Sequence, residues 1–191
     1  MKHLLLTTIA AVMLVGCGPS ASDISIHKAT KEGNIEAVKQ HLAAGADVKD
    51  EYGATPLHIA AGNNQNEIAK LLIKEGANVN IKDEDAYTPI HYASVNGHVD
   101  IVDLLLVNNA NINIHPENVY TSLHGAASGG HFDVVKLLIN KGAHLNSKDH
   151  MGDTPLDLAI HPENRNASSK TADLLRKHGG KTAKELKAEG K

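Results

Sequence analysis

Aromatic residues are scarce in this chain of 191 residues, which has no Trp, one Phe and four Tyr. A globular core of this size usually contains more aromatic rings, because each ring buries a large apolar area. Short stacked helices filled with Ala, Leu, Ile and Val do not need them. The composition therefore favours a layered helical architecture, at a length that suits one domain or a short repeat array.

Clustered positive charge is also missing. The formal net charge is −3, and the Lys-rich final residues carry interleaved acids. Binding to phosphate groups requires a concentrated basic surface. We therefore expect no nucleic-acid partner.

Recognisable catalytic motifs are absent from the sequence. It has no Ser-centred nucleophile elbow and no phosphate-binding glycine loop, and its one cysteine is Cys17. The acidic groups at Glu84-Asp85 and at 149–153 fall in expected loops, without the burial that tunes a carboxylate for acid–base chemistry. We expect no enzyme activity, no catalytic residue and no cofactor.

The first sixteen residues resemble a secretion signal. A basic start precedes a largely apolar run from Leu4 to Val15, which is too short for a membrane span of about 20 residues but suits a signal peptide. The run ends in Leu14-Val15-Gly16-Cys17, which resembles the bacterial lipobox. An ordinary signal peptide with an incidental cysteine is the alternative.

The lipobox resemblance implies a bacterial lipoprotein with a signal peptide at 1–16, lipid attached to Cys17 and a short linker at 17–22. We expect such a protein to be anchored in the membrane of the cell envelope and to face the periplasm. Residue 18 is Gly rather than Asp, which resembles the lipoproteins that enteric bacteria sort to the outer membrane.

A tetrapeptide motif recurs along the chain at a constant interval: Thr55-Pro56-Leu57-His58, Thr88-Pro89-Ile90-His91, Thr121-Ser122-Leu123-His124 and Thr154-Pro155-Leu156-Asp157. Leucine-rich triplets from positions 71, 104 and 137 keep the same period. Such self-similarity predicts a solenoid. A degenerate first copy and a last copy with a four-residue insertion complete five units, at about 23–49, 50–82, 83–115, 116–148 and 149–180, followed by a charged tail at 181–191.

The unit 83–115 shows what each copy is expected to form. Thr88 before Pro89 predicts a helix start, because Thr caps exposed amides and Pro suits the first helical position. Asn96-Gly97 ends this helix, and a second apolar-faced helix runs to Asn109, which can adopt positive φ in place of Gly. Helices this short are marginal alone in water, so stacking on neighbouring units must hold them.

A turn followed by two antiparallel helices, with Thr-Pro-Leu-His and Gly-Ala-Asn-Val-Asn (76–80), resembles the ankyrin repeat. The resemblance covers residues 23–180. It implies an all-α solenoid of five stacked helix-turn-helix units, joined by β-hairpin-like loops that we call fingertips. It also implies a concave protein-binding face made of fingertips and first helices. Beyond the last unit, Thr182 and Glu185 are placed to cap one more short helix.

The sequence departs from this family's pattern at two fingertips. The fingertip glycine is present as Gly53 and Gly152 but is replaced by Ala86 and Val119. A β-branched residue is strained at positive φ, so we expect a different turn at the fingertip that contains Val119. The phrase His-Pro-Glu-Asn occurs at both 115–118 and 161–164, the second time where the insertion lies, and no reason for the repetition is visible in the sequence.

Thirteen histidines raise the possibility of a metal site. One register contains a histidine in each of four units, namely His27, His58, His91 and His124. Stacked helices lie about 10 Å apart, whereas nitrogens that share one zinc ion lie within about 3.5 Å of each other. We therefore expect no metal, and we expect this register, together with His98 and His131, to hold helix starts by hydrogen bonding. A chance surface site among His115, His144, His150 and His161 is the alternative.

The tyrosines indicate a binding face. Three of them fall on fingertips and Tyr92 lies on a first helix, outside the Ala and Leu positions of the expected core. Tyrosine is favoured as an anchor in protein interfaces, although isolated exposed rings are the alternative. The predicted face consists of Tyr52, Glu84, Asp85, Tyr87, Tyr92, Val95, Asn96, Glu117, Asn118, Tyr120, His150 and Met151. It is mildly acidic, which favours a partner with a basic or mixed patch.

These features predict a monomeric, membrane-tethered module that binds another protein of the envelope. An immunity or inhibitor protein against a toxin is one version of this function. A structural envelope lipoprotein without a dedicated ligand is the alternative from another class. The identity of the partner is not encoded in the repeat pattern, because fold alone does not name function.

Overall fold

The computed structural model describes residues 24–45, 49–114 and 120–190. Predictions for the signal peptide, Cys17, the linker and the segment 115–119 lie outside the described residues. Within these ranges the chain forms helices and no strands: α1 (Ile26–Lys31), α2 (Ile35–Ala43), α3 (Pro56–Gly62), α4 (Asn66–Lys74), α5 (Pro89–Val95), α6 (Val99–Val107), α7 (Ser122–Ser128), α8 (Phe132–Asn140), α9 (Pro155–Ile160), α10 (Ser169–Lys177) and α11 (Ala183–Ala188).

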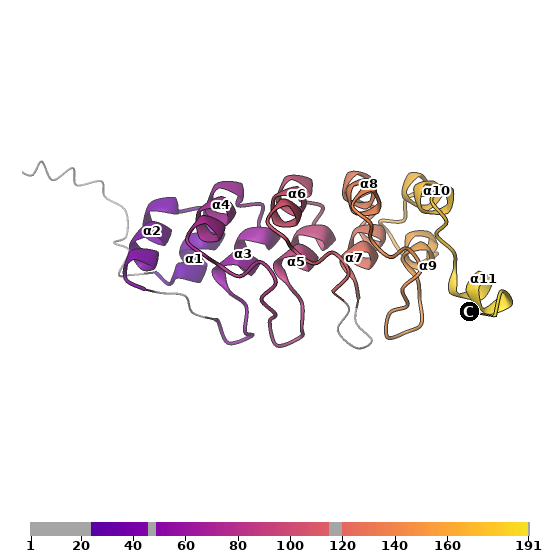
Figure 1. The fold of residues 1–191 in the computed structure, drawn as a ribbon, viewed down its shortest axis with the longest axis horizontal. Coiled ribbons are helices and arrows are strands. Elements are labelled where there is room, and N and C mark those ends of the chain that lie inside the picture. The colour runs from indigo at the N-terminus through magenta and orange to yellow at the C-terminus, as the bar shows by residue number, and fades with distance from the viewer. Residues whose placement is uncertain (1–23, 46–48, 115–119, 191) are drawn as a thin grey trace, which may run out of the picture.

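The helices form two rows, and this arrangement confirms the predicted all-α solenoid of stacked helix pairs (Figure 1). The first helices of the units, α1, α3, α5, α7 and α9, pack side by side in one row, and α2, α4, α6, α8 and α10 form the other. The loops between units project from the side of the first row. No helix in the described part of the chain is long and apolar enough to cross a membrane.

The core repeats with the sequence period. Ala60, Ala93, Ala126 and Ala159 occupy one buried position of the first helices. Alanine at this position lets neighbouring first helices approach closely, while larger side chains such as Leu72, Leu105 and Leu138 fill the space beneath the second helices. One continuous apolar core thus runs through the units, as expected when short helices are stable only by stacking.

The Thr-Pro-Leu-His motif closes the start of each first helix in the central units. The backbone N–H of Thr88 donates to Nδ1 of His91 at 3.1 Å, and the same bond joins Thr55 to His58 and Thr121 to His124. In the last unit a carboxylate oxygen of Asp157 accepts from Thr154 instead, at 2.9 Å. The predicted role of His58, His91 and His124 in holding helix starts is confirmed.

The first unit differs. Ser25, not His27, caps α1, by accepting from the N–H of Lys28 at 3.2 Å. The ring of His27 instead reaches the next unit, where its Nε2 lies 3.0 Å from the carbonyl oxygen of Ala54. The prediction for His27 was therefore wrong about its own helix, because Ser25 already occupies the capping position.

A second group of side chains, one before each second helix from α4 to α10, ties consecutive units together. His98 Nε2 lies 3.1 Å from the carbonyl of Gly62, and His131 Nε2 lies 2.9 Å from that of Val95. These two histidines were predicted to hold the starts of their own helices. That prediction was wrong, because their rings point back to the end of the preceding unit's first helix.

The insertion in the last unit preserves this connection. The Nδ2 of Asn164, in the second His-Pro-Glu-Asn phrase, donates to the carbonyl of Ser128 at 2.9 Å and to that of Leu158 at 2.9 Å. Asn164 stands one repeat period after His131, so it takes the histidine's place in the series. The inserted residues follow it and lengthen the connection to α10.

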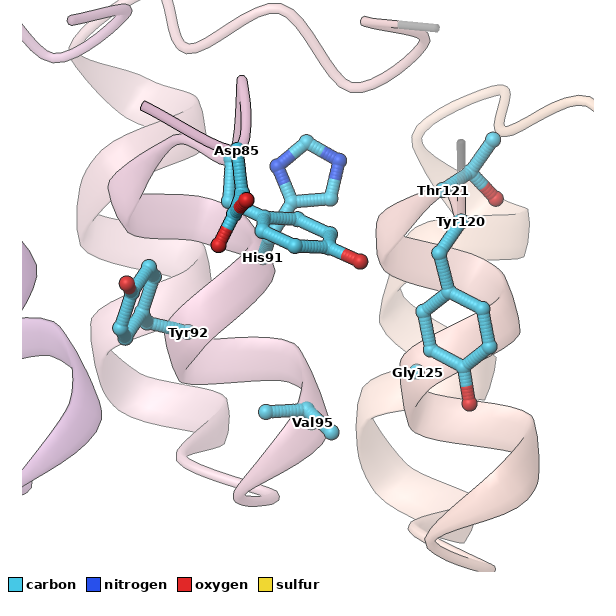
Figure 2. A pocket seen from close by; sticks show the side chains of 8 residues that line it. Asp85, His91, Tyr92, Val95, Tyr120, Thr121 and Gly125 are labelled. Atoms are coloured by element: carbon cyan, nitrogen blue, oxygen red, sulfur yellow. The ribbon is translucent and has the colours of Figure 1, made fainter. Parts of the chain in front are cut away.

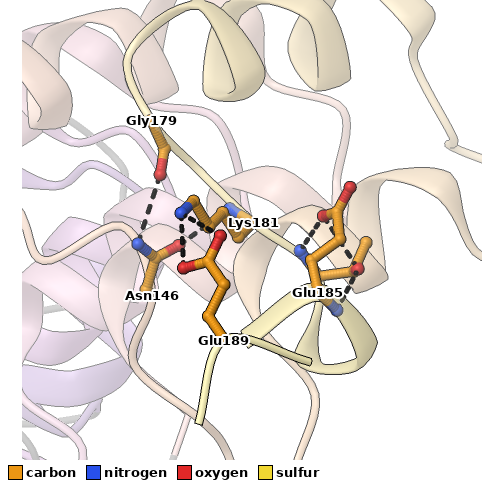
Figure 3. A network of polar contacts seen from close by, with 6 residues as sticks. Asn146, Gly179, Lys181, Glu185 and Glu189 are labelled. Atoms are coloured by element: carbon orange, nitrogen blue, oxygen red, sulfur yellow. Dashed lines mark hydrogen bonds and ion pairs between the residues drawn. The ribbon is translucent and has the colours of Figure 1, made fainter. Parts of the chain in front are cut away.

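Asparagines at 80, 113 and 146 make a third connection between units. Asn146 Nδ2 donates to the carbonyl of Gly179 at 3.2 Å, and its Oδ1 accepts from the N–H of Lys181 at 2.8 Å (Figure 3). Asn80 and Asn113 make the corresponding pair of bonds in earlier units. Each amide thereby satisfies a carbonyl and an N–H of the following loop.

Part of the predicted charged tail belongs to the folded array. Thr182 accepts from the N–H of Glu185 at 3.2 Å, and a Glu185 carboxylate oxygen accepts from the N–H of Thr182 at 2.7 Å, which confirms the predicted cap. Figure 3 shows these reciprocal capping bonds between Thr182 and Glu185 beside the Lys181–Glu189 ion pair. Helix α11 is joined to the last unit by the N–H of Ala183, which donates to Asp157 Oδ2 at 2.8 Å, and its Leu186 is buried.

The fingertips are hairpin-like turns stabilised by an aspartate. In the fingertip of the third unit, the N–H of Asp83 donates to the Tyr87 carbonyl at 3.0 Å, and Asp83 Oδ1 accepts from the N–H of Tyr87 at 2.9 Å. Asp50 and Asp149 do the same in their units. Ala86 adopts φ 64° there, the left-handed conformation that Gly152 adopts with φ 87° in the fingertip of the last unit.

Exchanging alanine and glycine at positions 86 and 152 should change the free energy of unfolding in opposite directions. A left-handed conformation costs an L-residue roughly 1–2 kcal/mol, partly offset by the greater freedom of glycine in the unfolded chain. Ala86→Gly should therefore stabilise the protein by about 1 kcal/mol, and Gly152→Ala, whose new Cβ meets no atom within 4 Å, should destabilise it by a similar amount. Urea unfolding measures both, and changes of the same sign would contradict this account of the turn.

Candidate functional site

Five residues of the predicted face line a single groove. Asp85, Tyr87, Tyr92, Val95 and Tyr120 surround a space of about 300 Å³ between the third and fourth units. His91, Thr121 and Gly125 complete its lining. Figure 2 shows the groove between α5, which carries Tyr92 and Val95, and α7, which carries Gly125.

A small residue lines the groove. Tyr92 and Gly125 occupy the same position of consecutive units, one repeat period apart. In the third unit Tyr92 packs against Gly62 of the preceding helix, where an added Cβ would lie 3.3 Å from the ring. In the fourth unit Gly125 carries no side chain at this position, and Val95 packs close to it, since an added Cβ would lie 3.3 Å from Val95 Cβ. Val95 and Gly125 therefore border the groove beside Tyr120 without a ring at this position.

Tyr92 is half-buried and held in place. Its hydroxyl donates to Asp83 Oδ2 at 2.7 Å, and its ring meets that of His58 edge-on, with centroids 5.3 Å apart. Burial, together with the hydrogen bond to Asp83 and the charge of that carboxylate, raises the pKa of Tyr92. This ring is a fixed wall of the groove, and its hydroxyl is already engaged.

Tyr87 and Tyr120 stand at the fingertip end of the groove. Tyr87 meets His91 edge-on with centroids 5.5 Å apart, and Tyr120 stacks on His124 at 5.6 Å. Burial raises the pKa of both phenols, and the charges of Asp85 and Asp83 add to the effect on Tyr87. Both tyrosines are half-buried, so each ring is positioned by a histidine and still presents a surface to the groove.

His91 presents a hydrogen-bond donor with no partner. Its Nδ1 accepts from the backbone N–H of Thr88, so the neutral ring carries its proton on Nε2. The side chain is buried, with 5% exposed, and Nε2 has no hydrogen-bond partner among the described residues. The backbone of Ile114 acts to raise the pKa of His91, against the larger opposing effect of burial. In Figure 2 the ring of His91 lies between α5 and Thr121.

The equivalent histidines show what His91 lacks. His58 Nε2 lies 3.2 Å from the carbonyl of Tyr87, and His124 Nε2 lies 3.1 Å from that of Asp153, in each case in the loop that follows. For His91 the corresponding residue is Tyr120. Among the described residues, the junction between the third and fourth units therefore lacks the connection that His58 and His124 make at theirs, beside the groove.

The other predicted residues lie elsewhere on the array. Tyr52, 67% exposed, lies on the fingertip that precedes Glu84, whose N–H donates to the Tyr52 carbonyl at 3.1 Å. Asn96 ends α5 and donates to the Tyr92 carbonyl. Met151, 75% exposed, borders a separate hollow in the last unit, which His161 and Asn164 also line. The neighbouring His150 is exposed. Glu117 and Asn118 lie outside the described residues.

Sequence reasoning missed three residues of this site. His91 and Thr121 were assigned only to helix starts, and Gly125 was not considered. The spacing contains the signal for Gly125, since the positions 59, 92, 125 and 158 read Ile, Tyr, Gly and Leu. A small residue in a series of large ones predicts a hollow between units.

Comparison with known families matches two models described as ankyrin repeats, in three copies over residues 26–116 and in many copies over residues 114–159. The chain belongs to the ankyrin-repeat family. The repeats of this family indicate a module that binds another protein, so the resemblance drawn from the tetrapeptide is confirmed.

Individual relatives resemble parts of this ankyrin protein. Protein phosphatase 1 regulatory subunit 27 from Homo sapiens is 45% identical over 56 residues, which are 28% of this chain and 36% of that protein. A putative ankyrin repeat protein from Rickettsia bellii is 43% identical over 65 residues, 30% of this chain and 38% of its own. Myotrophin from Xenopus tropicalis is 38% identical over 52 residues, 26% and 44% of the two chains.

The matched segments thus span less than half of each of these relatives. These segments show that the repeats are shared, but they do not assign the relatives' binding partners to this chain. Within the described ranges, no group of three or more His, Cys, Asp and Glu is placed to hold a metal ion.

The buried state of His91 predicts a dependence of stability on pH. Burial lowers the pKa of His91 from 6.5 to about 4, and it also lowers the pKa of His58. Below pH 6.5 the unfolded chain binds a proton at His91 that the folded chain does not bind until about pH 4. The free energy of unfolding should therefore fall as the pH falls through this window, by about 2 kcal/mol from His91 alone between about pH 7.5 and about pH 5.

Urea unfolding of the wild type and of His91→Asn at both pH values measures this contribution. Asn retains an oxygen that can accept from Thr88 but does not titrate, so the variant should lose about 2 kcal/mol less stability on acidification. Val107→Ala, at an exposed side chain, leaves every histidine in place; it is the control and should leave the pH dependence unchanged. Equal pH dependence of wild type and His91→Asn would contradict the assignment.

Proposed function

We propose that this ankyrin protein is a membrane-tethered interaction module, which binds a protein of the bacterial envelope through the fingertips and first helices of its second to fourth units. The observation that carries this proposal is the groove at the junction of the third and fourth units. Five residues selected from the sequence as interface anchors line it, and three of them are tyrosines. Tyrosine and other large side chains in pockets supply much of the binding energy of protein interfaces.

The tether is the part of the proposal that rests on the sequence alone. The lipobox-like run that ends in Cys17 supports attachment to a membrane, with the repeats exposed to the periplasm and the outer membrane as the destination. A linker of a few residues would hold the binding face close to the membrane, since an extended chain spans at most about 3.6 Å per residue. Partners would then be proteins that reach this surface.

Removal of the two fingertip tyrosines tests the binding face. Tyr87→Ala combined with Tyr120→Ala should reduce capture of the partner by about tenfold or more, because each change removes an interface anchor that typically contributes about 1–2 kcal/mol. Quantitative crosslinking in intact cells measures capture, and circular dichroism of the purified variants should show unchanged helicity. Val107→Ala, an equally apolar change at a side chain 61% exposed on α6, is the matched control and should have no effect.

The same experiment separates binding from a purely structural role. A dedicated interaction module should crosslink to one dominant protein that the tyrosine variant no longer captures. A structural envelope lipoprotein should crosslink to many neighbours at low yield, and the double substitution should change none of them. Unchanged capture by the double variant would rule out the proposed face.

Labelling of cells with radioactive palmitate tests the anchor. The wild-type protein should incorporate label and fractionate with membranes. Cys17→Ser should lose both properties, because the chain has no other cysteine to carry the lipid. Label retained by Cys17→Ser would refute attachment at this residue, while a wild-type protein without label would reduce the segment to an ordinary signal peptide.

A further inference from the structure

The groove between the third and fourth units has the electrostatic character of a cation site. Its lining includes the carboxylate of Asp85, and Asp83 lies behind Tyr92 as the acceptor of its hydroxyl proton. Among the described residues that line the groove, none is Lys or Arg. His91 adds no positive charge, since its buried ring is neutral near pH 7. A cation that enters the groove therefore meets negative charge without a competing basic side chain.

The walls of the groove suit a flat cation. Three tyrosine rings and Val95 line the groove, and the negative faces of aromatic rings attract positively charged groups. A guanidinium group stacks on aromatic rings and pairs with a carboxylate at its edge, and it loses water more readily than an ammonium group. Arginine fits these walls better than lysine for this reason.

His91 adds a second requirement for a ligand, which is a hydrogen-bond acceptor. Its Nε2–H is a buried donor without a partner among the described residues, beside the groove. A buried donor without an acceptor costs free energy, so a ligand that brings an acceptor to it gains affinity. The side chain of arginine has no acceptor. The acceptor must then come from another part of the ligand, and a peptide carbonyl is uncharged and compatible with the nearby carboxylates.

We propose that the groove binds an arginine residue of the partner protein, with the guanidinium between the tyrosine rings and Asp85, and with a main-chain carbonyl of the same segment accepting from His91 Nε2. The proposal rests on the proposed function and specifies the chemistry of the partner. A peptide segment supplies both groups at once, whereas a small organic cation supplies only the first. The carbonyl replaces, from outside, the connection that His58 and His124 make within the array.

Selection from a displayed library of short random peptides tests the chemistry without knowledge of the partner. The full chain is the target, and the variant Val95→Arg, which places a fixed positive charge in the groove at an exposed position, removes peptides that bind elsewhere. The remaining peptides should share an arginine. Exchange of that arginine for citrulline, its neutral counterpart, should weaken binding at least tenfold, and exchange for lysine should weaken it less.

Asp85→Asn should weaken the selected peptides by about twofold to fivefold, as expected for the loss of one exposed ion pair. Asp133→Asn, at an exposed aspartate on α8, is the matched control and should have no effect. Peptides without a shared arginine, or an affinity indifferent to citrulline, would overturn the inference. A free guanidinium salt that competes with the peptides at equal concentration would assign the groove to small cations and would also overturn it.

A nuclear magnetic resonance measurement of the His91 side chain tests the carbonyl contact without a substitution that removes a helix cap. In 15N-histidine-labelled protein, exchange of the Nε2 proton with water should slow at least tenfold when a selected peptide binds. An unchanged exchange rate in the saturated complex would refute this contact.

The outcomes distinguish this inference from the proposed function. If capture of the partner depends on Tyr87 and Tyr120 but is unchanged by Asp85→Asn, the result supports the interaction module and rules out the arginine site. If the double tyrosine variant captures the partner normally, the proposed function itself falls.

Discussion

Hydrogen bonds between consecutive units are the constraint on which the rest of this structure depends. Each unit leaves polar groups that only its neighbour satisfies. Asn146 serves both a carbonyl and an N–H of the following loop, and His131 reaches the carbonyl of Val95 in the preceding unit. These bonds require suitable residue types at a constant repeat period, and the apolar core beneath them continues from unit to unit. Short helices that are marginally stable alone become stable in the array, because neighbouring units supply their hydrogen-bond partners and bury their apolar faces.

The candidate site lies where this regularity is interrupted. At the junction of the third and fourth units, His91 Nε2 has no partner among the described residues, unlike the equivalent nitrogens of His58 and His124, and Gly125 lines the groove at the position where Tyr92 carries a ring one unit earlier. The sequence departs from its own pattern at the same junction, with Pro116 at the position of the fingertip aspartate and Val119 at that of the glycine. Local departures from an otherwise consistent pattern are expected at functional sites. The junction exchanges a connection within the array for a surface that another molecule can occupy.

The sequence alone was sufficient for the fold, because the repeat period, the capping residues and the small residues at helix ends each depend only on local chemistry. It predicted Asn109 at positive φ, and the structure gives φ 66°. It did not reveal which way His27, His98 and His131 point, because a side chain at a unit boundary can serve either neighbour. Ala86 was recognised as a departure, but only the structure shows that alanine retains the left-handed turn, held by Asp83. The groove could not be predicted from one unit alone, since its lining comes from two consecutive units, with Val95 on α5 and Gly125 on α7.

The central claim is that a partner protein occupies the groove beside Val95. Photo-crosslinking from a benzoylphenylalanine placed at position 95 of the full-length protein in intact cells tests it most directly, because this exposed side chain faces the groove and crosslinks form only within a few ångströms. We expect one dominant crosslinked protein from position 95 and none from position 107, at the end of α6 in the row of second helices. No crosslinked product at position 95, or the same products from both positions, would contradict it.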